Sequence, residues 1–286
     1  MAFTTLVDTA DVAAHLDDAN VVIVDCRYKL SDESWGANQY LASHVPGAVY
    51  AHLDSDLSGK TTGRNGRHPL PSAEMLARTF GRLGISNRSQ IIAYDQDDGT
   101  FASRLWWLAK WIGHDAVAVL NGGFAKWLAE GRPTRSGQEA REPAMFRGAL
   151  RQAMAVDVDE VARESRRGGV LLVDARAPER YRGELEPIDR VAGHIPGAVN
   201  HHFKRNLEGG GRFRSSRELR EQFLDTLGGA PPEQVICYCG SGVTACHNLL
   251  ALEHAGLHGA RLYAGSWSEW TSDPERPVER GRQPNQ

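Results

Sequence analysis

The sequence has few cysteines, almost no net charge and no long hydrophobic run. Its 286 residues include four cysteines, too few for a disulfide framework, so we expect a reducing, cytoplasmic setting. The 33 Lys and Arg residues against 36 Asp and Glu give a net charge of −3, which argues against a broad basic surface for nucleic acid. The longest apolar stretches, such as residues 21–24 and 170–173, are too short to span a membrane. The N-terminal residues also lack the basic head and apolar block of a secretion signal.

An internal repeat is the most prominent feature that the sequence does have. Its composition, 41% hydrophobic and 24% charged, is that of a globular chain, and its length suits two domains. Four sequence blocks recur in the same order in both halves: 22–27 with 171–176, 44–49 with 194–199, 91–94 with 235–238, and 122–127 with 265–270. The repeat predicts a duplicated pair of domains at 1–132 and 154–286, joined by a linker at 133–153 that contains Pro, Gly and several charges.

Short β-branched runs alternate with segments of helical period in each half. This alternation predicts an α/β fold with a mostly parallel sheet flanked by helices. The expected strands are 21–25, 90–94 and 116–120 in the first half, and 170–174, 235–238 and 261–263 in the second. The expected helices are 73–83, 101–111, 217–227 and 244–254. Each His-x-Pro-Gly-Ala-Val block is expected to turn into a further short strand, and the polar tail after Pro274 to lie extended on the surface or fray.

The two halves diverge at one loop. After Tyr94 the chain is acidic, beginning with Asp95, whereas Tyr238 is followed by Cys239-Gly-Ser-Gly-Val-Thr and a helix. Ligands of parallel α/β sheets bind at the carboxyl ends of the strands. Gly240 and Gly242 permit a backbone that aims successive N–H groups, including those of Val243 and Thr244, at one point. Such N–H groups, more than the helix dipole, are expected to stabilise a Cys239 thiolate and to hold a persulfide or a small anion.

These residues resemble tandem-domain sulfurtransferases of the rhodanese type, over nearly the whole chain. The resemblance rests on the loop Cys239-Gly-Ser-Gly-Val-Thr and on several other blocks, which are the paired Val-Asp-x-Arg and His-x-Pro-Gly-Ala blocks and the stretches 63–71, 121–123 and 265–270. The resemblance implies two rhodanese-like domains, each a mostly parallel five-stranded sheet flanked by helices. It also implies that only the second domain carries the sulfur-accepting cysteine.

The loop residues bear on the sulfur donor. In thiosulfate-using members of this family the two positions after the cysteine are typically basic, but here they are Gly240 and Ser241. The loop is similar to the version that uses 3-mercaptopyruvate. That resemblance implies a proton relay of Ser241, His68 and Asp54.

The resemblance also implies arginines that hold the donor. Arg180 matches the arginine that binds the donor's carboxylate, a role that suits a guanidinium fork. A second substrate arginine is expected nearby. Arg190 is the nearest candidate, and Arg182 is the alternative, because this loop is about three residues shorter than in animal members of the family.

The residues together predict an enzyme that moves sulfur from 3-mercaptopyruvate through a Cys239 persulfide to a thiol, cyanide or a thioredoxin-like acceptor. No metal or organic cofactor is expected, because the cysteine itself carries the sulfur. Thiosulfate is the alternative donor, and a persulfide-carrying module with little turnover is an alternative function. A thiol phosphatase is disfavoured, because Ala245 occupies the position where that chemistry needs an arginine.

The remaining candidate residues are interpreted structurally. Cys26 and Cys237 are expected to be buried, while Cys246 leaves open a disulfide with Cys239 under oxidation. His201 and His202 lack partners at zinc spacing and are expected in a surface or loop position. The acidic group that begins at Asp95 is expected to cap a helix, in preference to binding a cation.

Overall fold

The structure, a computed structural model, describes residues 2–281 and divides into two compact units. The first unit contains the chain up to Gly59, then Pro71–Arg151 and Leu207–Phe213. The second contains Lys60–Leu70, Gln152–Asn206 and the chain from Arg214 onward. The segment Lys60–Leu70 is therefore part of the unit that contains Cys239, although it lies far from that residue in sequence.

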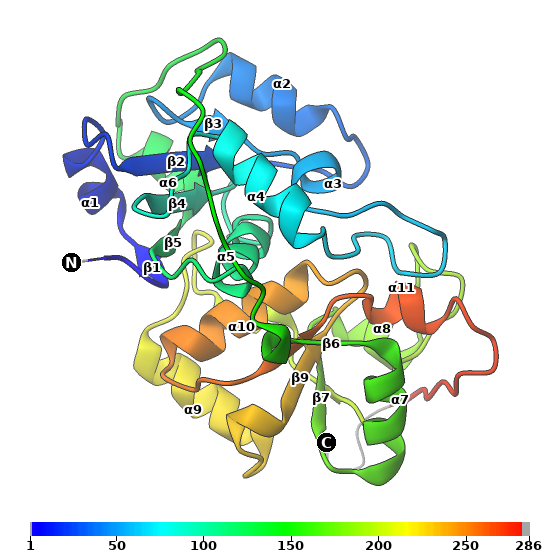
Figure 1. Cartoon of the computed structure of the whole chain (residues 1–286). Helices are drawn as coiled ribbons and strands as arrows, with labels where there is room; N and C mark the ends of the chain where they lie inside the picture. Colours follow the sequence, from blue (N-terminus) through cyan, green and yellow to red (C-terminus); the bar gives the residue numbers. More distant parts are fainter. Residues whose placement is uncertain (1, 282–286) are drawn as a thin grey trace. The chain divides into compact units, whose positions relative to one another are not determined.

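Each unit holds one five-stranded sheet whose described strands are all parallel (Figure 1). The order is β1-β5-β4-β2-β3 in the first and β6-β10-β9-β7-β8 in the second, so the two units repeat one topology. The strands are β1 (Leu6–Val7), β2 (Val21–Asp25), β3 (Val49–Tyr50), β4 (Gln90–Tyr94), β5 (Val117–Leu120), β6 (Ala155–Val156), β7 (Leu171–Asp174), β8 (Val199–Asn200), β9 (Val235–Tyr238) and β10 (Arg261–Tyr263). The predicted α/β class, repeat and two domains of five strands are confirmed.

Four of the helices that flank the sheets were predicted, and these four (α4, α5, α9 and α10) begin and end close to the predicted residues. Those of the first unit are α1 (Thr9–Ala14), α2 (Trp35–Ala42), α3 (Leu53–Asp56), α4 (Ala73–Arg82), α5 (Ala102–Trp111) and α6 (Gly123–Ala129). Those of the second are α7 (Val158–Arg167), α8 (Pro178–Arg182), α9 (Ser216–Leu227), α10 (Thr244–His254) and α11 (Ser266–Trp270), with 3₁₀ turns at Gln152–Met154, Phe203–Asn206 and Pro232–Gln234. The Ser72 hydroxyl caps α4 by accepting the Met75 N–H at 3.1 Å, which explains why this helix begins where the sequence predicted.

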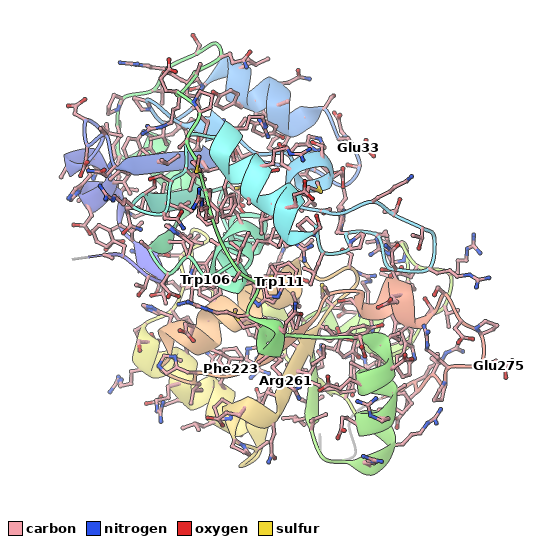
Figure 2. The ribbon with its side chains drawn as sticks, in the orientation of Figure 1. Glu33, Trp106, Trp111, Phe223, Arg261 and Glu275 are labelled. Carbon is pink, nitrogen blue, oxygen red and sulfur yellow. The ribbon has the colours of Figure 1, made fainter. Side chains whose placement is uncertain are left out.

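The helices bury their apolar faces against the sheets. On α5, Trp106 and Trp111 (both labelled in Figure 2) are 3% and 5% exposed, and the rings of Trp107 and Trp111 stack with centroids 5.5 Å apart. In the second unit, α10 packs beside α9 (Figure 1) and is buried along most of its length. Within residues 2–281, no helix has both the length and the apolar character that a membrane span requires.

The repeated Val-Asp-x-Arg block forms a buried ion pair in each unit. Arg27 donates from Nη2 to Asp25 at 2.6 Å, and Arg176 makes the same bond to Asp174 at 2.6 Å. Each arginine also reaches the loop before the edge strand, through Ser43 O at 2.6 Å in one unit and Gly193 O at 2.7 Å in the other. All four side chains are 2% exposed or less, so the motif ties the end of a central strand to a neighbouring loop.

The structure tests the expectations for His201 and for the C-terminal tail. His201 lies in a loop, one of the two positions expected for it, although its side chain is fully buried. The ring stacks on that of Phe223 (labelled in Figure 2), with centroids 4.2 Å apart, and its nitrogens contact Thr226 Oγ1 at 2.8 Å and Asn206 Oδ1 at 3.0 Å. The tail after Pro274 begins with a turn, and beyond it Glu279 pairs with His194 in an isolated antiparallel bridge. Residues 282–286 lie outside the described part.

Burial of His201 predicts acid sensitivity of the fold. Burial lowers the pKa of His201 to about 3, whereas an unfolded histidine takes up a proton at about pH 6.5. The unfolded chain therefore binds more protons between these values, so stability is fully present above about pH 6.5 and falls as the pH drops. The free energy of unfolding is measured with urea from pH 7 to pH 5. Below pH 6.5 it should fall more steeply with pH in the wild type than in His201→Gln, by about 1.4 kcal/mol per pH unit.

A matched control is His15→Gln, which alters an exposed histidine and should keep the wild-type pH dependence. Parallel curves for wild type and His201→Gln would contradict the expected role of His201.

Candidate functional site

Cys239 lies at the carboxyl end of β9, the middle strand of its sheet, and directly before the loop that leads into α10. Its side chain is 2% exposed, and the Gly242 N–H donates to its Sγ at 3.1 Å. Gly242 has φ +76°, and a Cβ at this position would lie 2.4 Å from Ala264 O. Only glycine fits both this backbone conformation and this close approach. Of the loop N–H groups predicted to point at the sulfur, that of Gly242 does so.

The peptide around Cys239 is held by the start of α11. The Cys239 N–H donates to Ser266 Oγ at 3.1 Å, and Cys239 O accepts from Trp267 N at 2.9 Å. Ser266 has φ +55°, a conformation that costs a non-glycine residue about 1–2 kcal/mol. This strained serine holds the backbone of Cys239 in place. Ser266 was not among the predicted site residues, because no local sequence pattern marks a positive φ at a serine.

Ser241 and His68 lie together in the second unit. The Ser241 hydroxyl and His68 Nδ1 are 2.8 Å apart, and the two residues are 6% and 4% exposed. The segment with His68 is anchored next to α11, because Arg67 N donates to Ser268 Oγ at 3.1 Å. A Cβ on Gly66 would lie only 2.7 Å from Gly265 O, so glycine permits this backbone approach. The structure thus joins two of the three residues of the expected relay.

The third residue, Asp54, belongs to the first unit. Its Oδ2 accepts the Tyr28 hydroxyl at 2.5 Å, and burial raises the pKa of that tyrosine, as does the hydrogen bond to Asp54. The role of Asp54 in a relay stays a prediction.

The arginines expected to hold the donor have different environments. Arg180, on α8, donates to Glu186 Oε1 at 2.7 Å and to Asp189 Oδ2 at 3.1 Å. Arg182 donates to Glu184 at 2.8 Å. Arg190 is exposed and has no ion pair among the described residues. Substrate binding by Arg180 and Arg190 stays a prediction.

Arg180 belongs to a line of alternating charges that starts in the core. Arg176 links Asp174 of β7 to Glu186 at 3.2 Å, Glu186 holds Arg180, and Asp189 lies between Arg180 and Arg67. Burial alone would raise the pKa of Glu186, but hydrogen bonds from Arg180 and from backbone N–H groups hold it below its usual range. Burial raises the pKa of Asp189 despite the nearby Arg67. Arg67, Glu186 and Asp189 were not among the predicted site residues, although Arg67 precedes His68 in the stretch 63–71.

The other candidate residues take structural positions. Cys26 and Cys237 are buried as expected, and burial raises the pKa of both thiols. Cys246 is buried and reduced, and its thiol donates to Gly242 O at 3.2 Å. Asp95, which follows β4 as Cys239 follows β9, accepts N–H groups of Gly99, Phe101 and Ala102 at 2.7–3.2 Å. The expected helix cap at α5 is therefore present, and burial raises the pKa of this carboxyl to about 7.

Fold and site define a class of protein. Two parallel α/β units of one topology, with a buried cysteine on a glycine-rich loop in one unit and a carboxylate at the equivalent place in the other, define a duplicated protein with one candidate cysteine site. The Rhodanese-like domain family matches the chain twice, at residues 8–130 and 157–273. The chain belongs to this family and is a sulfurtransferase.

Its relatives carry two kinds of name. The chain is 44% identical to a probable 3-mercaptopyruvate sulfurtransferase of Pseudomonas aeruginosa, over 98% of this chain and the whole relative. It is 38% identical to a putative thiosulfate sulfurtransferase of Mycobacterium tuberculosis, over 96% of this chain and 97% of the relative. Among solved structures, 3-mercaptopyruvate sulfurtransferase from Leishmania major superposes with a TM-score of 0.84 at 32% identity, over 96% of this chain and 75% of that one.

Proposed function

We propose that this enzyme takes sulfur from 3-mercaptopyruvate, carries it as a persulfide on Cys239, and passes it to a small thiol, cyanide or a thioredoxin-like protein in the cytoplasm. The observation that carries the choice of donor is the buried pair of Ser241 and His68, joined at 2.8 Å beside the cysteine. A mercaptopyruvate donor requires a proton to be moved during the reaction, whereas thiosulfate does not. A hydroxyl and an imidazole in contact can perform that step.

The first half-reaction transfers one sulfur atom from the donor to Cys239. The Cys239 thiolate attacks the donor's thiol sulfur, an S–S bond forms, and the C–S bond breaks with its electron pair passing to pyruvate enolate. The proton of the donor thiol then moves to the enolate carbon, which leaves a deprotonated persulfide and pyruvate. We propose that Ser241 and His68, which are in contact at 2.8 Å, carry that proton and that Asp54 assists them. The N–H groups of Gly242, Val243 and Thr244 would stabilise the sulfur anion.

Arg180 is proposed to bind the donor's carboxylate, as a guanidinium fork does.

In the second half-reaction the acceptor's thiolate, or cyanide, attacks the outer sulfur of the persulfide and releases the Cys239 thiolate. No atom in either step requires a metal or an organic cofactor.

Thiosulfate is the second candidate donor. The side chains of Arg67 and Arg180 lie close to Gly240. They favour thiosulfate, because they supply positive charge where a sulfite leaving group would develop negative charge. With this donor the thiolate attacks the outer sulfur, and sulfite leaves directly with the electron pair.

Substitution of Ser241 separates the two donors. We expect Ser241→Ala to lower kcat with mercaptopyruvate by about 10²-fold, the usual contribution of a positioned acid–base group. Persulfide formation from thiosulfate should change by less than about threefold, because sulfite needs no proton to leave. Pyruvate release and sulfite release in single-turnover assays measure the two reactions on one protein. An equal loss with both donors would refute the relay, and a wild type that prefers thiosulfate would reverse the donor assignment.

A further inference from the structure

Residues 278–281, here called the tail strap, contact both ends of one loop of the second unit. That loop, residues 183–192 (here the charged loop), follows α8 and carries Glu186 and Asp189, the two carboxylates that contact Arg180. The strap belongs to the chain that follows α11 (red in Figure 1) and lies in the same unit as the charged loop. A segment distant in sequence is therefore in contact with the loop that holds Arg180.

Backbone hydrogen bonds join the strap to the start and to the end of the charged loop. The Gly281 N–H donates to Arg182 O at 3.0 Å, directly before the loop. The His194 N–H donates to Glu279 O at 2.8 Å, and the Glu279 N–H donates to His194 O at 3.0 Å, just after the loop. Neighbouring residues of the strap thus hold two points of the chain that are far apart along the loop.

The Arg280 side chain packs between the same two ends. A Cβ built on Gly183 would lie 3.0 Å from Arg280 Cγ, and one built on Gly193 would lie 3.2 Å from the same atom. Arg280 Nε donates to Ala192 O at 3.1 Å. A Cβ on Gly193 would also lie 2.4 Å from Glu279 O, so glycine at this position is what lets the strap approach the loop.

We propose that the tail strap is a positioning segment for donor binding. By holding both ends of the charged loop, it keeps Glu186 and Asp189 against the guanidinium of Arg180, so that this group faces the donor in one orientation. The inference rests on the proposed function, because it takes Arg180 as the group that binds the donor. The strap acts through Arg180 and has no part in the chemical step.

The expected effect follows from the freedom of an arginine side chain. Contacts that fix Arg180 before the donor arrives lower the entropic cost of binding. A loosened loop returns that cost to the donor, and one immobilised side chain accounts for about a 3- to 10-fold change in binding. Cys239, Ser241 and His68 lie outside the charged loop, so bond breaking should keep its rate. Loss of the strap contacts should therefore raise KM and leave kcat unchanged.

The test combines steady-state kinetics with hydrogen–deuterium exchange on the full-length chain. Arg280→Ala removes the side chain that packs between the loop ends, and Gly193→Ala places a Cβ against Glu279 O without a change of charge. We expect each variant to raise the KM for mercaptopyruvate about 3- to 10-fold and to keep kcat within about twofold. Amide exchange in residues 183–192 should become faster in both, because the loop ends open more often.

Two variants serve as matched controls. Gly197 also has a positive φ, +77°, but a Cβ there meets nothing within 4 Å, so Gly197→Ala adds backbone strain without displacing the strap. In the first unit, Arg135 forms an antiparallel bridge with His44 as Glu279 does with His194. Gly197→Ala and Arg135→Ala should both keep the wild-type KM and the wild-type exchange of residues 183–192.

The outcomes separate the strap from the proposed function. A wild-type KM in Arg280→Ala, an equal loss in Gly197→Ala, or a raised KM in Arg280→Ala with unchanged exchange would each overturn the inference. Circular dichroism identifies a variant that fails to fold, and Arg280→Ala, which strains no backbone, then decides alone. Should the wild type use thiosulfate and not mercaptopyruvate, while Arg280→Ala raises the KM for thiosulfate and speeds exchange, the donor assignment fails and the strap stands.

Discussion

Replacement of Cys239 by serine is expected to abolish sulfur transfer with either donor, by at least about 10³-fold, since a covalent carrier has no substitute. Serine preserves the size of the side chain and can still accept the Gly242 N–H that now contacts Sγ at 3.1 Å. Its hydroxyl is a weak nucleophile that forms no persulfide. The variant should therefore fold normally, and mass spectrometry after exposure to donor should find no added sulfur at position 239.

Cys26→Ala is the matched control for this prediction. Cys26 is a fully buried thiol in the first unit, so its removal should leave sulfur loading at Cys239 intact. Full turnover by Cys239→Ser, or sulfur found on another cysteine of the wild type, would refute the proposed carrier.

Substitution of Gly242 should have the next largest effect. Alanine here must adopt φ +76° and place its Cβ 2.4 Å from Ala264 O, a backbone atom that cannot move aside cheaply. The left-handed conformation alone costs about 1–2 kcal/mol, and relief of the clash must shift the N–H that contacts Cys239 Sγ. We expect Gly242→Ala to lower the rate of persulfide formation by about 10²-fold, a size seen when one donor of an anion-stabilising cradle is lost.

The control for this substitution is Gly168→Ala. Gly168 also has a positive φ, +69°, but a Cβ there meets nothing within 4 Å. The Gly168→Ala variant should lose stability and keep its activity, as measured by urea unfolding and single-turnover rates. Because the strain of Gly242→Ala can also unfold the protein, circular dichroism and the alkylation rate of Cys239 by iodoacetamide are measured together. A folded Gly242→Ala with a wild-type alkylation rate would show that this N–H does not activate the sulfur.

The parts of the fold that could be predicted are those with a strong local signal. β2, β4 and β9 are runs of apolar residues that the sheet buries almost completely, so composition alone reveals them. β1 and β6 are two residues long and lie at sheet edges, where only pairing to a distant strand defines them. Helix α7 was also missed. Among its residues Val161 alone is buried, although Asp157 caps its start and Gly168 ends it at a positive φ.

The same distinction holds for the candidate site. The loop at Cys239 could be found because its glycines and the helix after it are contiguous in sequence. Ser241 and His68 were paired through the family resemblance alone, and the structure now gives them a contact. Arg67, Glu186 and Asp189 could not be found, because their significance comes from charges that only the folded chain brings together.

The absence of a side chain at Gly240 has an evolutionary consequence. Arg67 and Arg180 fill the space into which a residue at position 240 would extend, so a lysine or arginine there would compete with Arg67 for the same volume. Positions 67 and 240 should therefore covary across the family: lineages that gain a basic residue after the cysteine can discard the arginine before the histidine. In such lineages the two changes would be epistatic, with the basic residue at position 240 favourable only once Arg67 is lost.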